Sequence, residues 1–137
     1  MSRENVAIVR RAIAAHRSDD LEAAKEAILA LSDPSCEYIR VTAALEPQTY
    51  RGHDGIRRYF SDMVDDWGEW RAEAEEVIDA GPDTVLATMR FRATGKHSGA
   101  PIEARLGVVF VLSDGKLLRG HTYQSRDEAL EAVGLSE

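Results

Sequence analysis

The sequence has 137 residues, 44% of them hydrophobic and 30% charged, which is ordinary composition for one globular domain spanning residues 1–137. A formal net charge of −7 argues against nucleic acid as a partner, because phosphate contacts need clustered Lys and Arg. No apolar stretch approaches the roughly 18 residues of a membrane-spanning helix, and Cys36 is the single cysteine, so we expect no membrane contact and a reducing, cytoplasmic location.

Two amphipathic helices are predicted at the start of the chain. Apolar residues recur at helical spacing over residues 4–17, with arginines elsewhere around the helix. A second helix begins after Asp19, which is placed to act as N-cap, with Glu22 closing a capping box. It runs to about Leu31, because the residue before Pro34 avoids the helical region of backbone space.

The middle of the chain is predicted to hold a short strand, a loop and a long helix. Residues 36–41 alternate, so Cys36, Tyr38 and Arg40 share one face of a strand. Residues 42–50 show no periodicity and are expected to form a loop or a poorly formed strand. The clearest helix follows, with apolar residues at helical spacing: Ile56, Tyr59, Phe60, Met63, Val64 and Trp67.

The second half of the chain is predicted to consist mainly of strands. Residues 70–78 form a strand whose alternation breaks at Glu76, and residues 84–93 alternate as a half-buried strand. Residues 127–133 form a short closing helix, with Ser125 as its N-cap and Gly134 just beyond its end.

A long antiparallel hairpin over residues 102–123 is the strongest single feature. Asp114-Gly115 joins two runs of β-type residues. This dipeptide favours a type I′ turn, because that turn needs a positive φ at both of its central positions. A two-residue loop fixes the register, so that Leu112 faces Leu117, Phe110 faces Arg119 and Val108 faces His121. Both faces of this hairpin are largely apolar, so we expect each to be covered.

Helices followed by strands, with one helix interposed, predict an α+β domain in which a curved, mostly antiparallel sheet wraps around the N-terminal helices. Several short motifs occur in one order over nearly the whole chain: Asp19-Asp20-Leu21-Glu22, Tyr50-Arg51-Gly52-His53-Asp54-Gly55-Ile56, Arg90-Phe91-Arg92-Ala93-Thr94-Gly95, Ser98-Gly99, Asp114-Gly115-Lys116, residues 119–123, Glu128-Ala129-Leu130 and Gly134-Leu135. This order resembles the SnoaL-like branch of the nuclear-transport-factor-2-like superfamily. The resemblance implies a cone-shaped fold with an apolar pocket inside the cone, and usually a homodimer across the outer face of the sheet.

The catalytic residues of the ketosteroid isomerase relatives are not expected here. The resemblance places Tyr38, Ala12 and Gly107 where those relatives have a carboxylate base, a tyrosine and a protonated carboxylic acid. None of the three can take over these roles, so steroid-isomerase chemistry is not expected. The epoxide hydrolases of this fold need two aspartates bracketing an arginine, and Glu103 with Arg105 is the nearest substitute.

Three residues are therefore candidates for catalysis. Arg105 could hold a carboxylate or enolate oxygen, Glu103 could act as base if desolvation raised its pKa, and Tyr38 could donate a hydrogen bond to a ligand. The competing interpretation is structural: Arg105 and Glu103 form solvated ion pairs with each other or with Arg126, and Tyr38 bonds to the backbone.

The predicted faces also assign a pocket and an interface. The expected ligand-binding residues are Phe60, Trp67, Met89, Val109, Thr122 and Gln124. The expected dimer-interface residues are Phe110, Arg119, His121 and Tyr123. His121 has the pKa of an acid–base catalyst, but its position favours the interface.

The function predicted from the sequence is a small-molecule-binding protein of this fold. Its pocket would take an apolar, oxygen-bearing compound, with an isomerase, cyclase or hydrolase as the reaction class. The alternative is a non-catalytic binding or assembly module. The histidines show no metal-ligand spacing and the glycines no phosphate-cradling spacing, so neither a metal nor another cofactor is expected.

Overall fold

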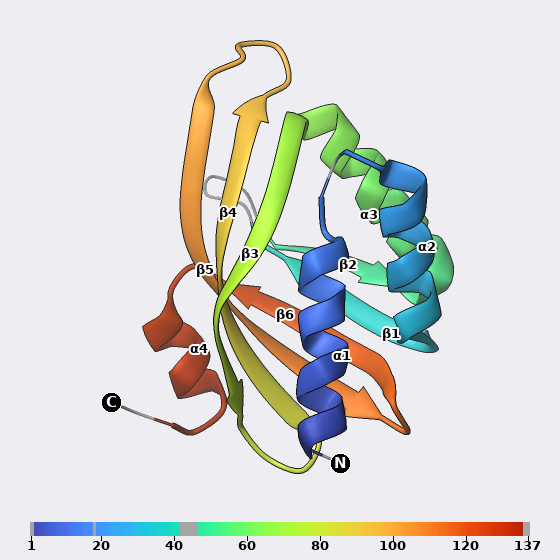
Figure 1. The fold of residues 1–137 in the computed structure, drawn as a ribbon, viewed down its shortest axis with the longest axis vertical. Helices are drawn as coiled ribbons and strands as arrows, with labels where there is room; N and C mark the ends of the chain where they lie inside the picture. Colours follow the sequence, from blue (N-terminus) through green and yellow to red (C-terminus); the bar gives the residue numbers. More distant parts are fainter. Residues whose placement is uncertain (1, 18, 42–46, 136–137) are drawn as a thin grey trace.

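The computed structural model describes residues 2–17, 19–41 and 47–135, and Figure 1 shows how their helices and strands are arranged. In chain order the elements are α1 (Ser2–Ala15), α2 (Leu21–Leu31), β1 (Ser32–Arg40), β2 (Gln48–Arg51), α3 (Gly52–Asp66), β3 (Trp67–Asp79), β4 (Thr84–Gly95), β5 (Pro101–Ser113), β6 (Lys116–Tyr123) and α4 (Arg126–Ala132). The predicted loop over residues 42–50 lies partly outside the described residues, and its described end forms β2.

The strands form one curved sheet in the order β2-β1-β6-β5-β4-β3. All neighbours are antiparallel except β1 and β6, which run parallel. Helices α1, α2 and α3 lie on the concave side of the sheet, and α4 lies on the opposite side (Figure 1). The predicted α+β class is therefore confirmed, and α4 covers part of the face opposite to α1, α2 and α3.

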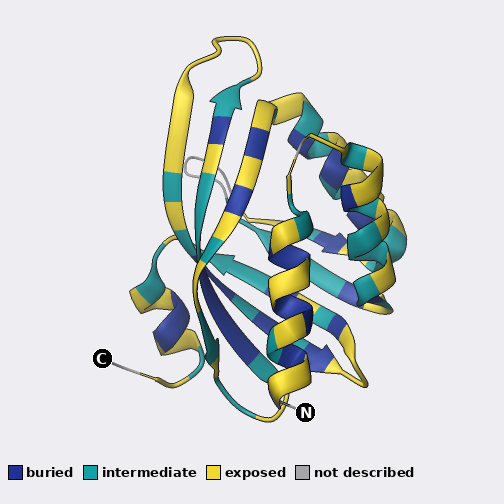
Figure 2. Ribbon diagram, in the orientation of Figure 1, coloured by how far each residue is buried: buried dark blue, intermediate teal, exposed yellow. Residues whose placement is uncertain are grey.

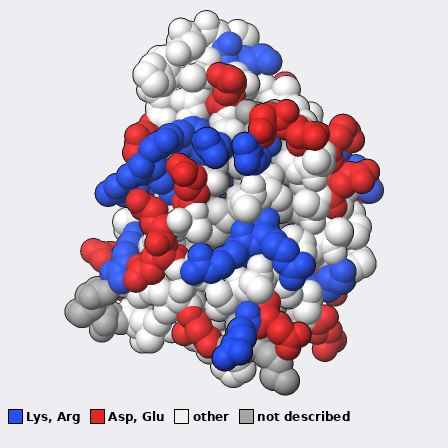
Figure 3. Space-filling model, in the orientation of Figure 1, with Lys and Arg blue, Asp and Glu red and all other residues white. Residues whose placement is uncertain are grey.

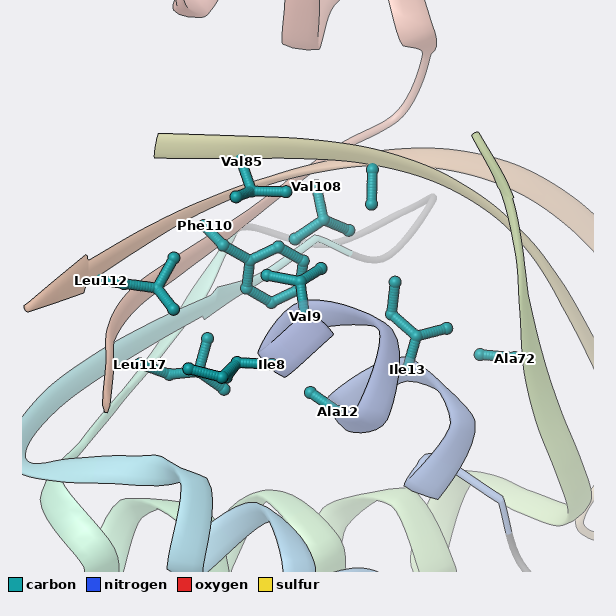
Figure 4. Packing of buried hydrophobic residues seen from close by; sticks show 11 residues of the cluster. Ile8, Val9, Ala12, Ile13, Ala72, Val85, Val108, Phe110, Leu112 and Leu117 are labelled. Atoms are coloured by element: carbon teal, nitrogen blue, oxygen red, sulfur yellow. The ribbon is translucent and has the colours of Figure 1, made fainter. Parts of the chain in front are cut away.

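The largest apolar cluster lies between α1 and the sheet. Val9 is fully buried, and Ile13 and Phe110 are nearly so. Figure 4 shows the α1 side chains pointing toward the residues of β4, β5 and β6 that face them. Figure 2 shows the resulting stripe of buried positions along α1, which alternates with exposed positions as the helical spacing predicts. This stripe anchors α1 across the sheet.

The hairpin turn is as predicted, but the register beyond it is not. Asp114 and Gly115 both have positive φ, of 50° and 77°, and Leu112 pairs with Leu117. A β-bulge then adds one residue to β6, so Val111, not Phe110, pairs with Arg119. From the bulge onward each β6 side chain therefore shares a face with the other set of β5 residues than predicted, so that Arg119 lies with Val111 and not with Phe110.

Local capping follows the sequence with one correction. The N-cap of α2 is Asp20, whose carboxylate accepts a hydrogen bond from the Ala23 amide, and not Asp19. Asp19 instead forms an ion pair with Arg17 at 2.8 Å. Ser125 caps α4 as predicted by accepting a bond from the Glu128 amide, and Gly134 has the expected positive φ of 78°.

Strand β3 is present with the predicted irregularity. The pairing of β3 with β4 shifts between Ala74 and Glu76, where the alternation in the sequence breaks. Among the described helices, none combines the length and the apolar character that crossing a bilayer requires.

Candidate functional site

Two adjoining cavities, which we call the inner and outer chambers, lie between the concave face of the sheet and the helices that cover it. The inner chamber has a volume of about 110 Å³, and most of its lining residues are apolar, including the buried Phe60, Phe110 and Leu117. The outer chamber has a volume of about 420 Å³ and reaches exposed residues such as Ile102. Five residues line both chambers and form what we call the waist: His16, Arg40, Tyr59, Met89 and Thr122.

A half-buried histidine–tyrosine pair occupies the waist. His16 follows α1, and its Nε2 atom shares a hydrogen bond with the Tyr59 hydroxyl of α3. Its Nδ1 atom is out of contact with solvent and has no hydrogen-bond partner among the described residues. Because buried polar atoms are normally satisfied, this Nδ1 atom is a candidate contact for a ligand.

Burial sets the protonation state of this pair. Desolvation, reinforced by the positive charge of Arg40 and partly opposed by the His16 backbone, lowers the pKa of His16 from 6.5 to about 4. Desolvation also raises the pKa of Tyr59, and Arg40 only partly offsets this effect. Near neutral pH both groups are therefore uncharged. A neutral imidazole that accepts the Tyr59 proton at Nε2 carries its own proton on Nδ1 and can donate it to a ligand oxygen.

Arg40 supplies the positive charge at the waist. Its side chain is only 11% exposed, one nitrogen lies 2.7 Å from an Asp66 carboxylate oxygen, and the guanidinium lies 5.9 Å from the centre of the Tyr59 ring. Burial works to lower the pKa of Arg40, but the bond to Asp66 and the proximity of Tyr59 leave it raised. A guanidinium carries five N–H donors, so Arg40 can hold an anionic oxygen in addition to Asp66.

Tyr38 is positioned differently. Its ring lines the inner chamber, and its hydroxyl lies 2.7 Å from Ser32 Oγ. Ser32 donates its own proton to the Ile28 carbonyl, so the Tyr38 hydroxyl is the donor in the bond to Ser32. Desolvation raises the pKa of Tyr38, which keeps it neutral. The Tyr38 hydroxyl proton is therefore not free to donate a hydrogen bond to a ligand.

The comparison with protein families decides the assignment of the fold. The sequence model described as the SnoaL-like domain matches residues 9–120, most of the chain. The chain belongs to the SnoaL-like domain family. Membership supports the predicted class, a small-molecule-binding SnoaL-like protein, and leaves the reaction unassigned.

Solved structures show the same fold over nearly the whole SnoaL-like chain. TerC, co-crystallised with polyporic acid, has a TM-score of 0.73 at 20% identity and covers 96% of this chain and 98% of its own. A putative SnoaL-like polyketide cyclase from Jannaschia sp. CCS1 has a TM-score of 0.72 at 14% identity, with 98% and 94% covered. A nuclear-transport-factor-2-like protein from Burkholderia thailandensis E264 has a TM-score of 0.74 at 26% identity, with 88% and 90% covered. No curated protein matches the sequence.

Most residues predicted to bind a ligand do line the cavity of this SnoaL-like domain. Phe60, Met89 and Thr122 line the inner chamber, and Trp67 and Gln124 line the outer chamber. Val109 is the exception, and its predicted placement in the pocket is wrong. The odd-numbered residues of β5 point away from α1. Val109 therefore packs on the opposite side of the sheet, against Leu130 of α4 and its neighbours.

Of the predicted catalytic residues, Arg105 lines the outer chamber, whereas Glu103 lines a separate surface pocket. The Arg105 side chain is 67% exposed and lies 3.4 Å from Glu75, and Glu103 lies 3.1 Å from Arg90. Figure 3 shows that basic and acidic side chains lie next to one another on the face drawn. Arg126, the other ion-pair partner considered, lies 2.9 Å from Glu76. Roles for Arg105 and Glu103 in catalysis stay predictions.

The predicted interface residues separate into two groups. Phe110 is 7% exposed and lines the inner chamber, so the face assigned to it was wrong. Arg119, His121 and Tyr123 lie on the opposite face, where the His121 and Tyr123 rings stack at 4.3 Å. Helix α4 of the same chain covers part of this outer face. It lies so close to β5 that a Cβ added at Gly107 would meet the Ala129 Cβ at 2.7 Å.

The sequence interpretation missed the pair at the waist, although a signal for it was present. His16 lies three and four residues beyond Ile13 and Ala12, and so continues the buried stripe of α1. Tyr59 is one of the apolar-spaced residues of α3. A titratable residue that continues a buried stripe is a candidate for the site. Among the described residues, no group of three or more His, Cys, Asp or Glu side chains could hold a metal ion.

The lowered pKa of His16 predicts a loss of stability in mild acid. Below about pH 6.5 the unfolded chain takes up a proton at His16 that the folded protein binds only near pH 4, so the free energy of unfolding falls as the pH is lowered through this window. Between pH 7 and about pH 4.5 this group alone removes about 2 kcal/mol. Urea unfolding at the two pH values measures the difference.

The matched variant replaces both partners, His16→Phe with Tyr59→Phe, so that no buried hydroxyl is stranded. Its pH dependence should be smaller than that of the wild type by about the same 2 kcal/mol. His97→Gln, at an exposed position, should behave like the wild type. Equal pH dependence in the wild type and the double variant would show that His16 titrates normally.

Proposed function

We propose that this SnoaL-like protein binds an apolar, ring-bearing compound through one of its oxygen atoms, which is held at the waist as an enolate or a polarised carbonyl. The observation that carries this proposal is the half-buried His16–Tyr59 pair beside Arg40, because it places neutral and charged donors in an otherwise apolar cavity. Donors preorganised in a dry site stabilise negative charge on oxygen more strongly than water does.

The reaction class that fits this arrangement is isomerisation or cyclisation through an enolate. A carbonyl oxygen at Arg40 and Tyr59 would gain negative charge as the neighbouring carbon loses a proton. His16 Nδ1 can accept that proton in the tautomer whose Nε2–H donates to Tyr59, and the charge of the enolate increases the affinity of the imidazole for it. Two relatives support this class of ligand: one was co-crystallised with polyporic acid and another is a putative polyketide cyclase.

Binding is tested with 2-hydroxy-1,4-naphthoquinone, whose enolate absorbs visible light. We expect the wild type to bind the enolate, with a change in the visible spectrum and a rise in melting temperature that grows with ligand concentration. The control is 1,4-naphthoquinone, which has the same rings without the acidic hydroxyl and should bind at least tenfold more weakly, because it lacks a charge-assisted bond. Equal affinity for the two compounds, or no binding of either, would contradict an oxygen site at the waist.

Turnover is tested with an enolisable ketone. In deuterated water the wild type should accelerate exchange of the α-protons of 2-tetralone, and His16→Gln should lose that acceleration while its melting temperature stays close to that of the wild type. Binding without exchange would support the non-catalytic alternative, a binding module with the same cavity.

The dimer and the location remain parts of this proposal. His121 and Tyr123 give the outer face a half-buried aromatic patch beside the exposed Arg119, which supports self-association there. The buried Cys36 thiol supports a reducing, cytoplasmic location.

A charge placed on that patch should weaken self-association. His121→Glu puts a carboxylate on the stacked rings, where pairing with a second copy would desolvate it, so we expect the mass measured by light scattering to fall toward that of the monomer. His97→Glu makes the same chemical change at an exposed turn position and should leave the mass unchanged. A His121→Glu protein with the wild-type mass would exclude this patch as the interface.

A further inference from the structure

The inner chamber is much smaller than the outer chamber, and this difference limits which part of a ligand each can hold. The inner chamber, of about 110 Å³, is smaller than the ~150 Å³ cavity that takes up a benzene molecule. The outer chamber, of about 420 Å³, falls in the range of pockets that hold whole ring systems. A ring system therefore fits the outer chamber but not the inner one.

The inner chamber has few polar groups to offer beyond the waist. Ala12, Ile28, Phe60, Phe110 and Leu117 line it, and the Tyr38 hydroxyl is already bonded to Ser32. An apolar cavity of this size takes an apolar group. A charged or strongly polar substituent placed there would lose its hydration without gaining partners.

We propose that the inner chamber is a specificity subsite for a short alkyl substituent of about three or four carbons on the ligand. The carbon that carries this substituent is the neighbour of the carbon whose oxygen is held at the waist. This inference rests on the proposed function, because it assumes that the oxygen lies between the two chambers. It assigns the substrate class as a ring compound that bears a short alkyl chain on the carbon beside its enolic oxygen. The ring lies in the outer chamber, the oxygen at Arg40, and the alkyl chain points inward.

Ala12 controls the depth of this subsite. It is 5% exposed and lies on α1, one turn before His16. Two methyl groups added at this position would project from the helix into a chamber whose walls include the buried Phe110 and Leu117. Ile28 on α2 lines the same chamber, so shortening it enlarges the chamber instead.

The experiment measures dissociation constants for a series of 3-alkyl-2-hydroxy-1,4-naphthoquinones, from hydrogen through methyl, ethyl and propyl to hexyl. With the wild type the affinity should rise about fourfold per methylene up to propyl, and it should fall at hexyl, where the chain no longer fits. Ala12→Val should move the optimum to methyl, and Ile28→Ala should move it beyond propyl. Ala14→Val makes the same change at an exposed position of α1 and should leave the optimum at propyl.

The outcomes separate this inference from the function on which it rests. If the unsubstituted compound binds but its homologues show no optimum, or if the optimum does not move in Ala12→Val and Ile28→Ala, the alkyl subsite is overturned and the oxygen site stands. If no member of the series binds the wild type, both proposals fail. Melting temperatures of the two cavity variants show whether each is folded before its affinities are compared. The two variants are expected to shift the optimum in opposite directions. Either variant that folds therefore tests the subsite.

Discussion

Arg40→Met should weaken binding of the 2-hydroxy-1,4-naphthoquinone enolate by one to two orders of magnitude. Methionine keeps the apolar length of the side chain and removes the charge-assisted bond, which contributes about 1.5–3 kcal/mol at a dry site. The fold should tolerate this change, because the stranded partner, Asp66, is 48% exposed and can be hydrated. Titration of the visible absorbance gives the dissociation constant, and the melting temperature shows whether the fold is kept.

Two controls decide whether Arg40 acts as a ligand contact. Asp66→Asn removes the other half of the ion pair and leaves the guanidinium in place, so binding should be kept or improved. Arg105→Ala removes an arginine that is 67% exposed and paired with Glu75, and it should change the affinity less than threefold. A large loss with Arg105→Ala and none with Arg40→Met would restore the candidate chosen from the sequence.

Phe110→Ala should lower the free energy of unfolding by about 3–5 kcal/mol. The phenylalanine is 7% exposed and belongs to the cluster between α1 and the sheet, so its removal leaves a cavity that the neighbouring side chains fill only in part. Urea unfolding at a single protein concentration measures the loss.

The neighbouring strand position provides the matched control. Val111 lies on the opposite face of β5, is half-buried and pairs with Arg119, so Val111→Ala should cost about 1 kcal/mol. If Phe110→Ala instead lost no more stability than Val111→Ala but dissociated a dimer, Phe110 would lie on the outer face and the bulge in β6 would be wrong.

Local sequence signals determined much of this fold. Asp114-Gly115 specified its turn because few residues adopt a positive φ at low cost, and Ser125 specified the start of α4 because its side chain satisfies an amide that the helix leaves free. The apolar spacing of residues 56–67 likewise predicted α3 and its buried face. Each of these features depends on residues within a few positions of one another.

The register of β6 was decided by tertiary packing. Without the bulge, Arg119 would lie opposite Phe110 and point toward α1, where its charge would be buried. With the bulge, Arg119 lies on the outer face, 3.8 Å from Glu37, and Gly120 takes the inner position. A Cβ at Gly120 would come within 2.7 Å of the Tyr38 ring, so only glycine fits against it. Neither Glu37 nor Tyr38 is near β6 in the sequence.

The site depends even more strongly on the tertiary structure. The sequence by itself determined that α1, β1 and α3 each have a buried face, and it therefore placed Tyr38 and Phe60 near a common interior. Only the packing of those three elements brought His16, Arg40 and Tyr59 together, because their side chains come from separate elements and His16 and Tyr59 are 43 residues apart. Periodicity identifies a buried face, whereas the crossing of the elements decides which polar residues on those faces meet.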